Sequence, residues 1–287
     1  MIVFEKVRGG YVHLVLSGRP HRLYYEESGE GIPLLCLHTA GADTRQFRGI
    51  LNDPQVTRNF RVIAFDLPWH GKSSPPEGWQ EEEYRLSCAG YLDAIDTFSN
   101  ALSLDRPVVL GCSIGGRAVL HLALRQPERY AALIGLESSA HADPYYDSNW
   151  VHRSDVHGGE ACAAIVSGAI GPDVPSRDRW ETLWHYMQSG PGVFRGDLNF
   201  YRTDSDVRAR LGEIDVSRCP IYLLTGNYDY SASPADTRVI VDAVPGIRFT
   251  EMKGLGHFPM SEDPQRFVSE YLLPVLDDLR KRNAVAR

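Results

Sequence analysis

A serine lies at the centre of the motif Gly111-Cys112-Ser113-Ile114-Gly115, between the apolar run Pro107 to Leu110 and an apolar helical pattern from Arg117 to Arg125. On such a turn from strand to helix the serine backbone is strained and its hydroxyl is exposed, and side chains two residues away would collide with the turn. Glycines at these two positions avoid the collision. The motif therefore predicts that Ser113 is a nucleophile and that the Ile114 N–H donates to an oxyanion.

Activation of a serine hydroxyl requires a base, and the base requires a carboxylate that orients it. Candidates for both follow late apolar runs: Asp229 comes shortly after Ile221 to Leu224, and His257 comes shortly after Ile247 to Glu251. Because the carboxyl ends of parallel strands meet at one edge of a sheet, we expect Ser113, Asp229 and His257 to lie together. Their order along the chain is serine, acid, histidine.

The elements that must position these residues follow an α/β pattern. Two alternating segments, Tyr11 to Ser17 and His21 to Glu27, predict an antiparallel hairpin at the start of the fold. From Ile32 onward, short apolar runs alternate with helical segments, which predicts a mainly parallel sheet covered by helices on both faces. The predicted strands are Ile32 to Leu37, Arg61 to Phe65, Pro107 to Leu110, Ala131 to Leu136, Ile221 to Leu224 and Ile247 to Glu251, and the predicted helices are residues 83–102, 114–125, 234–244 and 264–282.

The strand pattern stops between Ser139 and Ser217, where the composition turns toward His, Trp, Tyr, Arg and Gly. We predict that residues 139–216 form an inserted cap over a core of residues 1–138 and 217–287, with short helices near 159–167, 176–187 and 205–211. Aromatic residues of the cap are expected to line the roof of a substrate pocket or to pack the cap onto the sheet. Trp150 and Trp184 are the candidates for substrate contact.

Neither a metal nor an organic cofactor is predicted. His152, His157 and Glu160 do not share one helical face, and the proposed chemistry needs no metal ion. The chain contains neither the glycine fingerprint of a dinucleotide site nor a phosphate-binding loop.

Composition limits the partners and the compartment. A net charge of −7 disfavours nucleic acid, and 43% hydrophobic with 23% charged residues is typical of a soluble globular protein. No apolar run approaches the roughly 20 residues that span a bilayer, and Met1 to Lys6 lacks the order of a secretion signal. Five scattered cysteines indicate reduced thiols. We expect a cytoplasmic protein that binds a small-molecule substrate, without nucleic-acid or membrane partners; a homo-oligomer is possible.

Several motifs make the chain resemble the α/β-hydrolase family across essentially its whole length. They are Leu37-His38, the segment from Asp66 to Ser73, the Ser113 turn, Gly226 with Asp229, and Gly256-His257. The resemblance implies the α/β-hydrolase fold with an inserted cap. It also implies that Ser113 is the nucleophile, that His257 is the general base and then the acid, and that Asp229 orients the imidazole.

The resemblance leaves alternatives for individual residues. The second oxyanion N–H in the family comes from the loop after the third strand, which here means Ala40 or Thr39. A β-branched residue tolerates positive φ poorly, so we favour Ala40, and the Thr39 hydroxyl could instead contact the substrate or bond to backbone. Glu137 is an alternative to Asp229. Cys112 could rival Ser113, but its side chain is expected to point into the sheet.

The reaction predicted from this set is hydrolysis of a carboxylic ester through an acyl-enzyme. Hydrolysis of a C–C bond or of a lactone on the same three residues is an alternative, as is a slow receptor that holds a ligand. Phe258, directly after the histidine, is a candidate for substrate contact. Arg117 could bind a substrate carboxylate or pair along its helix.

Overall fold

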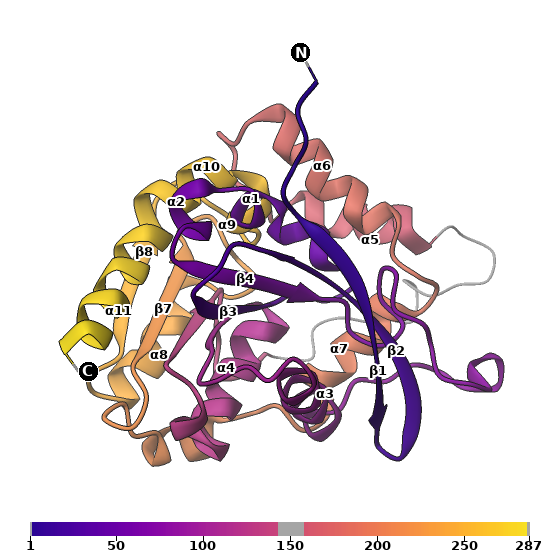
Figure 1. The fold of residues 1–287 in the computed structure, drawn as a ribbon, viewed down its shortest axis with the longest axis horizontal. Coiled ribbons are helices and arrows are strands. Elements are labelled where there is room, and N and C mark those ends of the chain that lie inside the picture. Colours follow the sequence, from indigo (N-terminus) through magenta and orange to yellow (C-terminus); the bar gives the residue numbers. More distant parts are fainter. Residues whose placement is uncertain (1, 143–157, 286–287) are drawn as a thin grey trace.

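A computed structural model describes residues 2–142 and 158–285 of the chain. It contains an eight-stranded sheet with the order β1-β2-β4-β3-β5-β6-β7-β8 (Figure 1). The pairs β1–β2 and β2–β4 are antiparallel, and all other neighbouring strands are parallel. The strands are β1 (Arg8–Leu16), β2 (Arg19–Ser28), β3 (Ile32–Leu37), β4 (Phe60–Phe65), β5 (Val108–Cys112), β6 (Ala132–Leu136), β7 (Ile221–Gly226) and β8 (Arg248–Met252).

The inner strands are hydrophobic along their whole length because both faces of the sheet are covered. Every residue of β5, β6 and β7 is buried, as expected for parallel strands between two layers of helices. Helix α3 (Cys88–Ala101) packs beside α4 (Ile114–Arg125), α11 (Leu273–Val285) packs beside α2 (Pro54–Thr57), and α8 (Pro234–Ala243) contacts β7 and β8. The prediction of a mainly parallel sheet that opens with an antiparallel hairpin is confirmed.

Several helical segments in the described part of the chain lie between β6 and β7 in the sequence. They are α5 (Gly158–Ser167), α6 (Ser176–Met187), α7 (Val193–Thr203) and the 3-10 segment η5 (Arg208–Glu213). Helix α6 has the predicted bounds, whereas α7 was not predicted, because Pro191, Gly192 and Gly196 interrupt the local pattern. The division into core and cap stays a prediction.

Shorter helical segments connect the main elements. They are η1 (Thr44–Phe47), α1 (Arg48–Leu51), η2 (Trp79–Glu81), η3 (Pro127–Arg129), α9 (Pro259–Glu262), α10 (Pro264–Arg266) and the π-helical turn η6 (Phe267–Leu272). The predicted helix 83–102 begins only at Cys88, where Ser87 accepts a hydrogen bond from the Gly90 N–H and caps the first turn.

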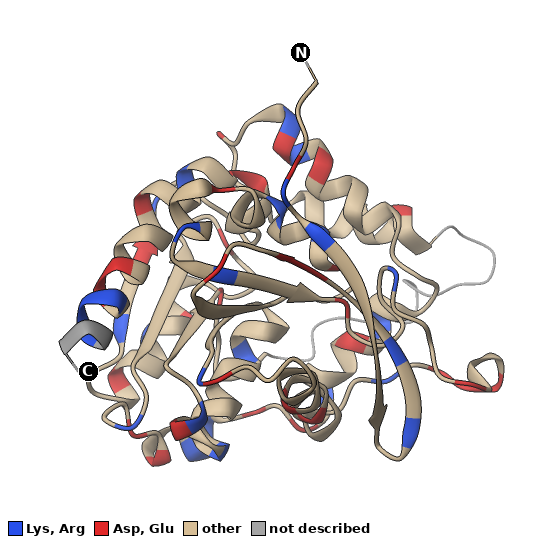
Figure 2. Ribbon diagram, viewed as in Figure 1, with Lys and Arg blue, Asp and Glu red and all other residues tan. Residues whose placement is uncertain are grey.

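Acidic and basic residues are interspersed along the elements, as Figure 2 shows for α11. On this helix Asp278 accepts from Arg282 at 2.9 Å, and Asp277 accepts from Arg280 at 3.3 Å. The basic end of the chain is therefore partly matched by carboxylates one turn earlier. Among residues 2–142 and 158–285, every helix is too short or too polar to traverse a lipid bilayer.

Candidate active site

Ser113 occupies the sharp turn between β5 and α4, with φ of 59° and ψ of −110°. Such a backbone conformation is rare for a residue with a side chain and is typical of functional turns. A Cβ on Gly111 would lie 2.3 Å from the Gly115 carbonyl oxygen, and a Cβ on Gly115 would lie 2.8 Å from the Leu37 carbonyl oxygen. Gly111 is therefore required by the turn itself, as the sequence indicated, whereas Gly115 is required because β3 lies close to the turn.

Asp229 and His257 are in direct contact after the ends of β7 and β8. The Nδ1 atom of His257 is 2.6 Å from Oδ2 of Asp229, and both side chains are buried. Asp229 also accepts from the Ser231 N–H at 2.7 Å, and the His257 N–H donates to the Ala169 carbonyl at 2.8 Å. These bonds fix the carboxylate and the histidine loop, so Nε2 is the ring nitrogen left for chemistry.

The pair has perturbed proton affinities. Burial alone would raise the pKa of Asp229, but the charge of His257 and their hydrogen bond hold it below its ordinary value. Burial alone would lower the pKa of His257, but the charge and hydrogen bond of Asp229 raise it above the ordinary value of 6.5. The arrangement thus favours an imidazolium beside a carboxylate, which is what a general base needs after it takes a proton.

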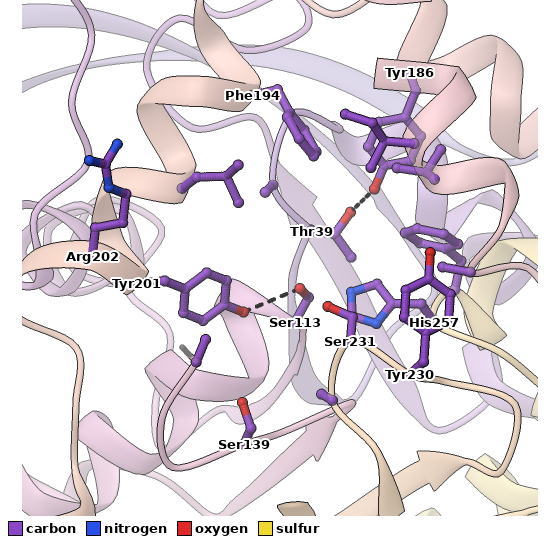
Figure 3. A pocket seen from close by; sticks show the side chains of 18 residues that line it. Thr39, Ser113, Ser139, Tyr186, Phe194, Tyr201, Arg202, Tyr230, Ser231 and His257 are labelled. Carbon is purple, nitrogen blue, oxygen red and sulfur yellow. Dashed lines mark hydrogen bonds between the residues drawn. The ribbon is translucent and has the colours of Figure 1, made fainter. Parts of the chain in front are cut away.

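Ser113 and His257 line one pocket (Figure 3). The Oγ atom of Ser113 is 3.2 Å from the hydroxyl of Tyr201. Within the described residues it makes no hydrogen bond to His257, so the serine is held toward Tyr201 in this state. Catalytic hydrogen bonds are often long or misaligned without substrate, and rotation of a serine side chain is a small movement.

In the loop after β3, the backbone donors on either side of Ala40 are engaged. The Thr39 N–H donates to the Gln46 side chain at 3.0 Å, and the Gly41 N–H donates to Asp197 at 2.7 Å. Between them, the Ala40 N–H has no acceptor among the described residues. This pattern favours Ala40 over Thr39 as a donor to an oxyanion. The Thr39 hydroxyl is also engaged, because it bonds to Gln46 and to Tyr186.

Glu137 lies behind Asp229 and does not contact His257 through a hydrogen bond. Both of its carboxyl oxygens accept from the Gly226 N–H at 3.0 Å, and it shares a hydrogen bond with Asp229. Burial, with the nearby charge of Asp229, raises the pKa of Glu137 well above its ordinary value. The geometry therefore favours Asp229 as the partner of the histidine, with Glu137 next to that carboxylate.

The remaining predicted residues lie in different surroundings. Thr39 and Phe258 line the pocket, whereas Trp184 does not and is 55% exposed on α6. Trp150 lies outside the described residues. Cys112 is fully buried, its Sγ faces the His257 carbonyl at 3.3 Å, and burial raises its pKa well above the ordinary value, so the thiol stays neutral.

Arg117 is buried inside the protein and does not face the pocket. Its guanidinium donates to the carbonyl and hydroxyl oxygens of Ser139 and of Ser205. The alternative in which Arg117 binds a substrate carboxylate is therefore wrong for this structure, because its donors already have protein acceptors. Pairing along the helix is not observed either.

Sequence reasoning missed three polar residues around the pocket: Tyr201 and Asp197 on α7, and Gln46 on η1. Asp197 and Tyr201 are four residues apart and hence share a helical face. That spacing was the available signal, but it becomes useful only once α7 is recognised as a helix.

Within the described residues, no group of three or more His, Cys, Asp or Glu side chains is arranged to hold a metal ion.

Comparison with known proteins relates the chain to a known fold. A family model described as the alpha/beta hydrolase fold matches residues 32–155. The chain is 24% identical over 275 residues to a pimeloyl-[acyl-carrier protein] methyl ester esterase of Nitrosomonas europaea, a match that covers 86% of this chain and 97% of the esterase.

Solved structures with the same fold include two hydrolases. A thermophilic esterase from Thermogutta terrifontis has a TM-score of 0.80 and 21% identity, and the match covers 94% of this chain and 99% of the esterase. The enol-lactonase from Burkholderia xenovorans has a TM-score of 0.78 and 18% identity, with 94% and 100% covered. The overall arrangement of sheet and helices is therefore the same in all three chains.

Proposed function

We propose that this chain, which has the α/β-hydrolase fold, is a serine hydrolase that cleaves the carboxylic ester of a small organic molecule. One observation carries the proposal: His257, held by Asp229 at 2.6 Å, lines the same pocket as a strained, glycine-flanked Ser113. A nucleophile, a base and an orienting carboxylate on separate loops form the minimal set for acyl transfer.

The proposed reaction has two halves. Nε2 of His257 takes the proton of Ser113 as Oγ attacks the ester carbon, and the carbonyl electron pair moves to oxygen. The N–H groups of Ala40 and Ile114 are the proposed donors to that oxygen. The tetrahedral intermediate expels the alcohol, which takes the proton from Nε2, and water then repeats the sequence to release the acid.

The pocket suits a short acyl group. It encloses about 70 Å³ and is lined largely by apolar side chains, among them Ile165, Val166, Phe194, Leu198 and Phe258. An apolar cavity of about 150 Å³ accepts benzene, so this space fits a few carbon atoms. We therefore propose that the preferred substrates are esters whose acyl groups are short and uncharged. The larger part of the alcohol would lie outside the enclosed space.

A panel of p-nitrophenyl esters with two to eight acyl carbons, run beside lactones and 1,3-diketones, tests the proposal. We expect repeated release of acid, fastest for the shortest acyl groups, and covalent labelling of Ser113 by an organophosphonate. Ser113→Ala is expected to abolish both while leaving the thermal transition unchanged. An unlabelled serine in folded protein would contradict the proposal.

The same panel separates the alternatives. Faster turnover of lactones or diketones than of esters would mean that the same three residues act on a different bond. A ligand that binds without product release would instead indicate a receptor.

A further inference from the structure

Tyr201 contacts the reacting oxygen from the side opposite the histidine. Its hydroxyl lies 3.2 Å from Oγ of Ser113, and Figure 3 shows Tyr201 and His257 on either side of the serine. Tyr201 belongs to α7, so the insertion supplies this contact to a nucleophile that belongs to the sheet. No sequence motif predicted the contact.

A buried cation lies against the ring of Tyr201. The guanidinium carbon of Arg117 is 5.0 Å from the ring centroid, and the side chain is fully buried. Its hydrogen bonds go to carbonyl and hydroxyl oxygens of Ser139 and Ser205, and no carboxylate among the described residues forms an ion pair with it. A cation against the ring face draws electron density from the phenol, which makes the O–H a stronger donor.

Tyr201 keeps its proton under ordinary conditions. Burial raises the pKa of Tyr201 to about 12, although the charge of Arg117 acts in the opposite direction. A protonated phenol can donate to Oγ, while Oγ donates its own hydrogen to a second acceptor, because a hydroxyl oxygen has two lone pairs and one hydrogen. The contact with Tyr201 is therefore compatible with proton transfer from Ser113 to His257.

We propose that Tyr201 is a further catalytic residue, whose hydroxyl donates to Oγ of Ser113 while that oxygen carries developing negative charge. This inference rests on the proposed function. In the first half of the reaction the Oγ proton moves to Nε2 of His257 as the Oγ–carbon bond forms. In the second half water attacks the acyl carbon and gives a proton to Nε2, the Oγ–carbon bond breaks, and Oγ takes that proton from Nε2. Tyr201 retains its own proton throughout.

The bond to Tyr201 is strongest when Oγ is most negative, which is in the transition states. In the acyl-enzyme Oγ is an ester oxygen and accepts hydrogen bonds poorly. A hydrogen bond to a charged oxygen is worth more than one to a neutral oxygen, so its loss is expected to slow each half-reaction roughly tenfold to a hundredfold.

The experiment compares Tyr201→Phe with the wild-type chain and with a matched control, Tyr91→Phe. The Tyr91 hydroxyl is buried, has no hydrogen-bond partner within residues 2–142 and 158–285, and belongs to a ring that contacts Phe200 next to Tyr201. Two rates are measured: phosphonylation of Ser113 by a p-nitrophenyl phosphonate, followed by mass spectrometry, and turnover of p-nitrophenyl acetate. Both are expected to fall roughly tenfold to a hundredfold in Tyr201→Phe and to stay unchanged in Tyr91→Phe.

A second substitution, Tyr201→3-fluorotyrosine, keeps the shape of the side chain and makes the phenol more acidic. Phosphonylation is expected to become faster, and an unchanged or slower rate would contradict a donor role.

The outcomes distinguish this inference from the proposed function. If wild-type protein is labelled and Tyr201→Phe is labelled equally fast or faster, only the role of Tyr201 is refuted; a faster rate would mean that the phenol restrains the serine. If folded wild-type protein is neither labelled nor active, the proposed function fails, and the role of Tyr201 fails with it.

Discussion

The substitution Asp197→Asn would test whether α7 fixes the position of the loop that carries Ala40. Asp197 is fully buried, and its Oδ2 atom is 2.7 Å from the Gly41 nitrogen and 2.7 Å from Nε2 of His70. Its Oδ1 atom accepts from the Tyr84 hydroxyl at 2.9 Å. An asparagine has only one acceptor oxygen, so Asp197→Asn directs an NH₂ group at one of these donors and leaves it unsatisfied.

The expected loss is large because a charged pair is involved. Removal of one partner of a buried, hydrogen-bonded charge pair destabilises a protein by about 3–5 kcal/mol. The amide oxygen of asparagine can still accept at one of the two oxygen positions, which reduces the loss of stability. We therefore expect Asp197→Asn to lower the free energy of unfolding by about 3 kcal/mol at pH 6. Since domains are stable by about 5–15 kcal/mol, the variant is expected to remain folded at 25 °C.

The loss should depend on pH with a defined sign. Burial alone would lower the pKa of His70, but the charge and hydrogen bond of Asp197 raise it above the ordinary value of 6.5. A raised histidine pKa contributes stability that is fully present below 6.5 and is lost as the pH rises through the folded-state value. The difference between wild type and Asp197→Asn is therefore expected to shrink between pH 6 and pH 9.

Urea denaturation at several pH values measures this difference, with Asp173→Asn at an exposed position as the control. Ester turnover measured on the same samples should fall, by up to about a hundredfold to a thousandfold if the Ala40 donor is displaced. A loss of unfolding free energy under about 1 kcal/mol at pH 6 would refute the reasoning, because a broken buried charge pair costs more than that. A loss that grows toward pH 9 would also refute it, because the raised pKa of His70 predicts the opposite trend.

Four further predictions concern the site. The kcat/KM for an ester should fall in acid with an apparent pKa above 6.5, because His257 must be neutral to act as a base. Asp229→Asn should lower kcat by about 10⁴-fold, as loss of an orienting carboxylate does elsewhere. Glu137→Gln should change kcat by less than about threefold, because burial raises the pKa of Glu137 and favours the uncharged form that glutamine mimics. A loss as large as that of Asp229→Asn in the same assay would instead make Glu137 the essential acid. Gly111→Ala should abolish soluble, folded protein, as judged by circular dichroism, since its Cβ would lie 2.3 Å from the Gly115 carbonyl oxygen; a folded, active variant would contradict that steric argument.

The sheet and the loops at its edge were predictable because their signals are local. The strand β3 and the helix α4 have the predicted bounds. A continuous apolar run indicates a buried strand, and an apolar pattern with helical spacing indicates a buried helix, without information from the rest of the chain. Ser113, Asp229 and His257 follow such runs directly, so their neighbourhood could be derived from the order of strands. Their catalytic roles stay predictions.

Contacts between the insertion and the sheet could not be derived in the same way. Tyr186 meets Thr39 across 147 positions of sequence, and Tyr201 meets Ser113 across 88. Trp184 is instructive, because helical spacing places it on one face with Trp180 but does not say which face turns inward. Both are exposed, at 55% and 62%. The orientation of α6 is decided by packing against partners that no local pattern encodes.

The acceptor role of Asp197 has a consequence for engineering. Gly41, His70 and Tyr84 all belong to the first part of the chain, yet the oxygens that satisfy them arrive on a helix encoded more than a hundred residues later. If the segment around α7 were deleted, or replaced by its equivalent from another hydrolase, three buried donors would have no acceptor. A transplanted segment therefore needs a carboxylate at the position of Asp197, because the recipient protein would otherwise be destabilised.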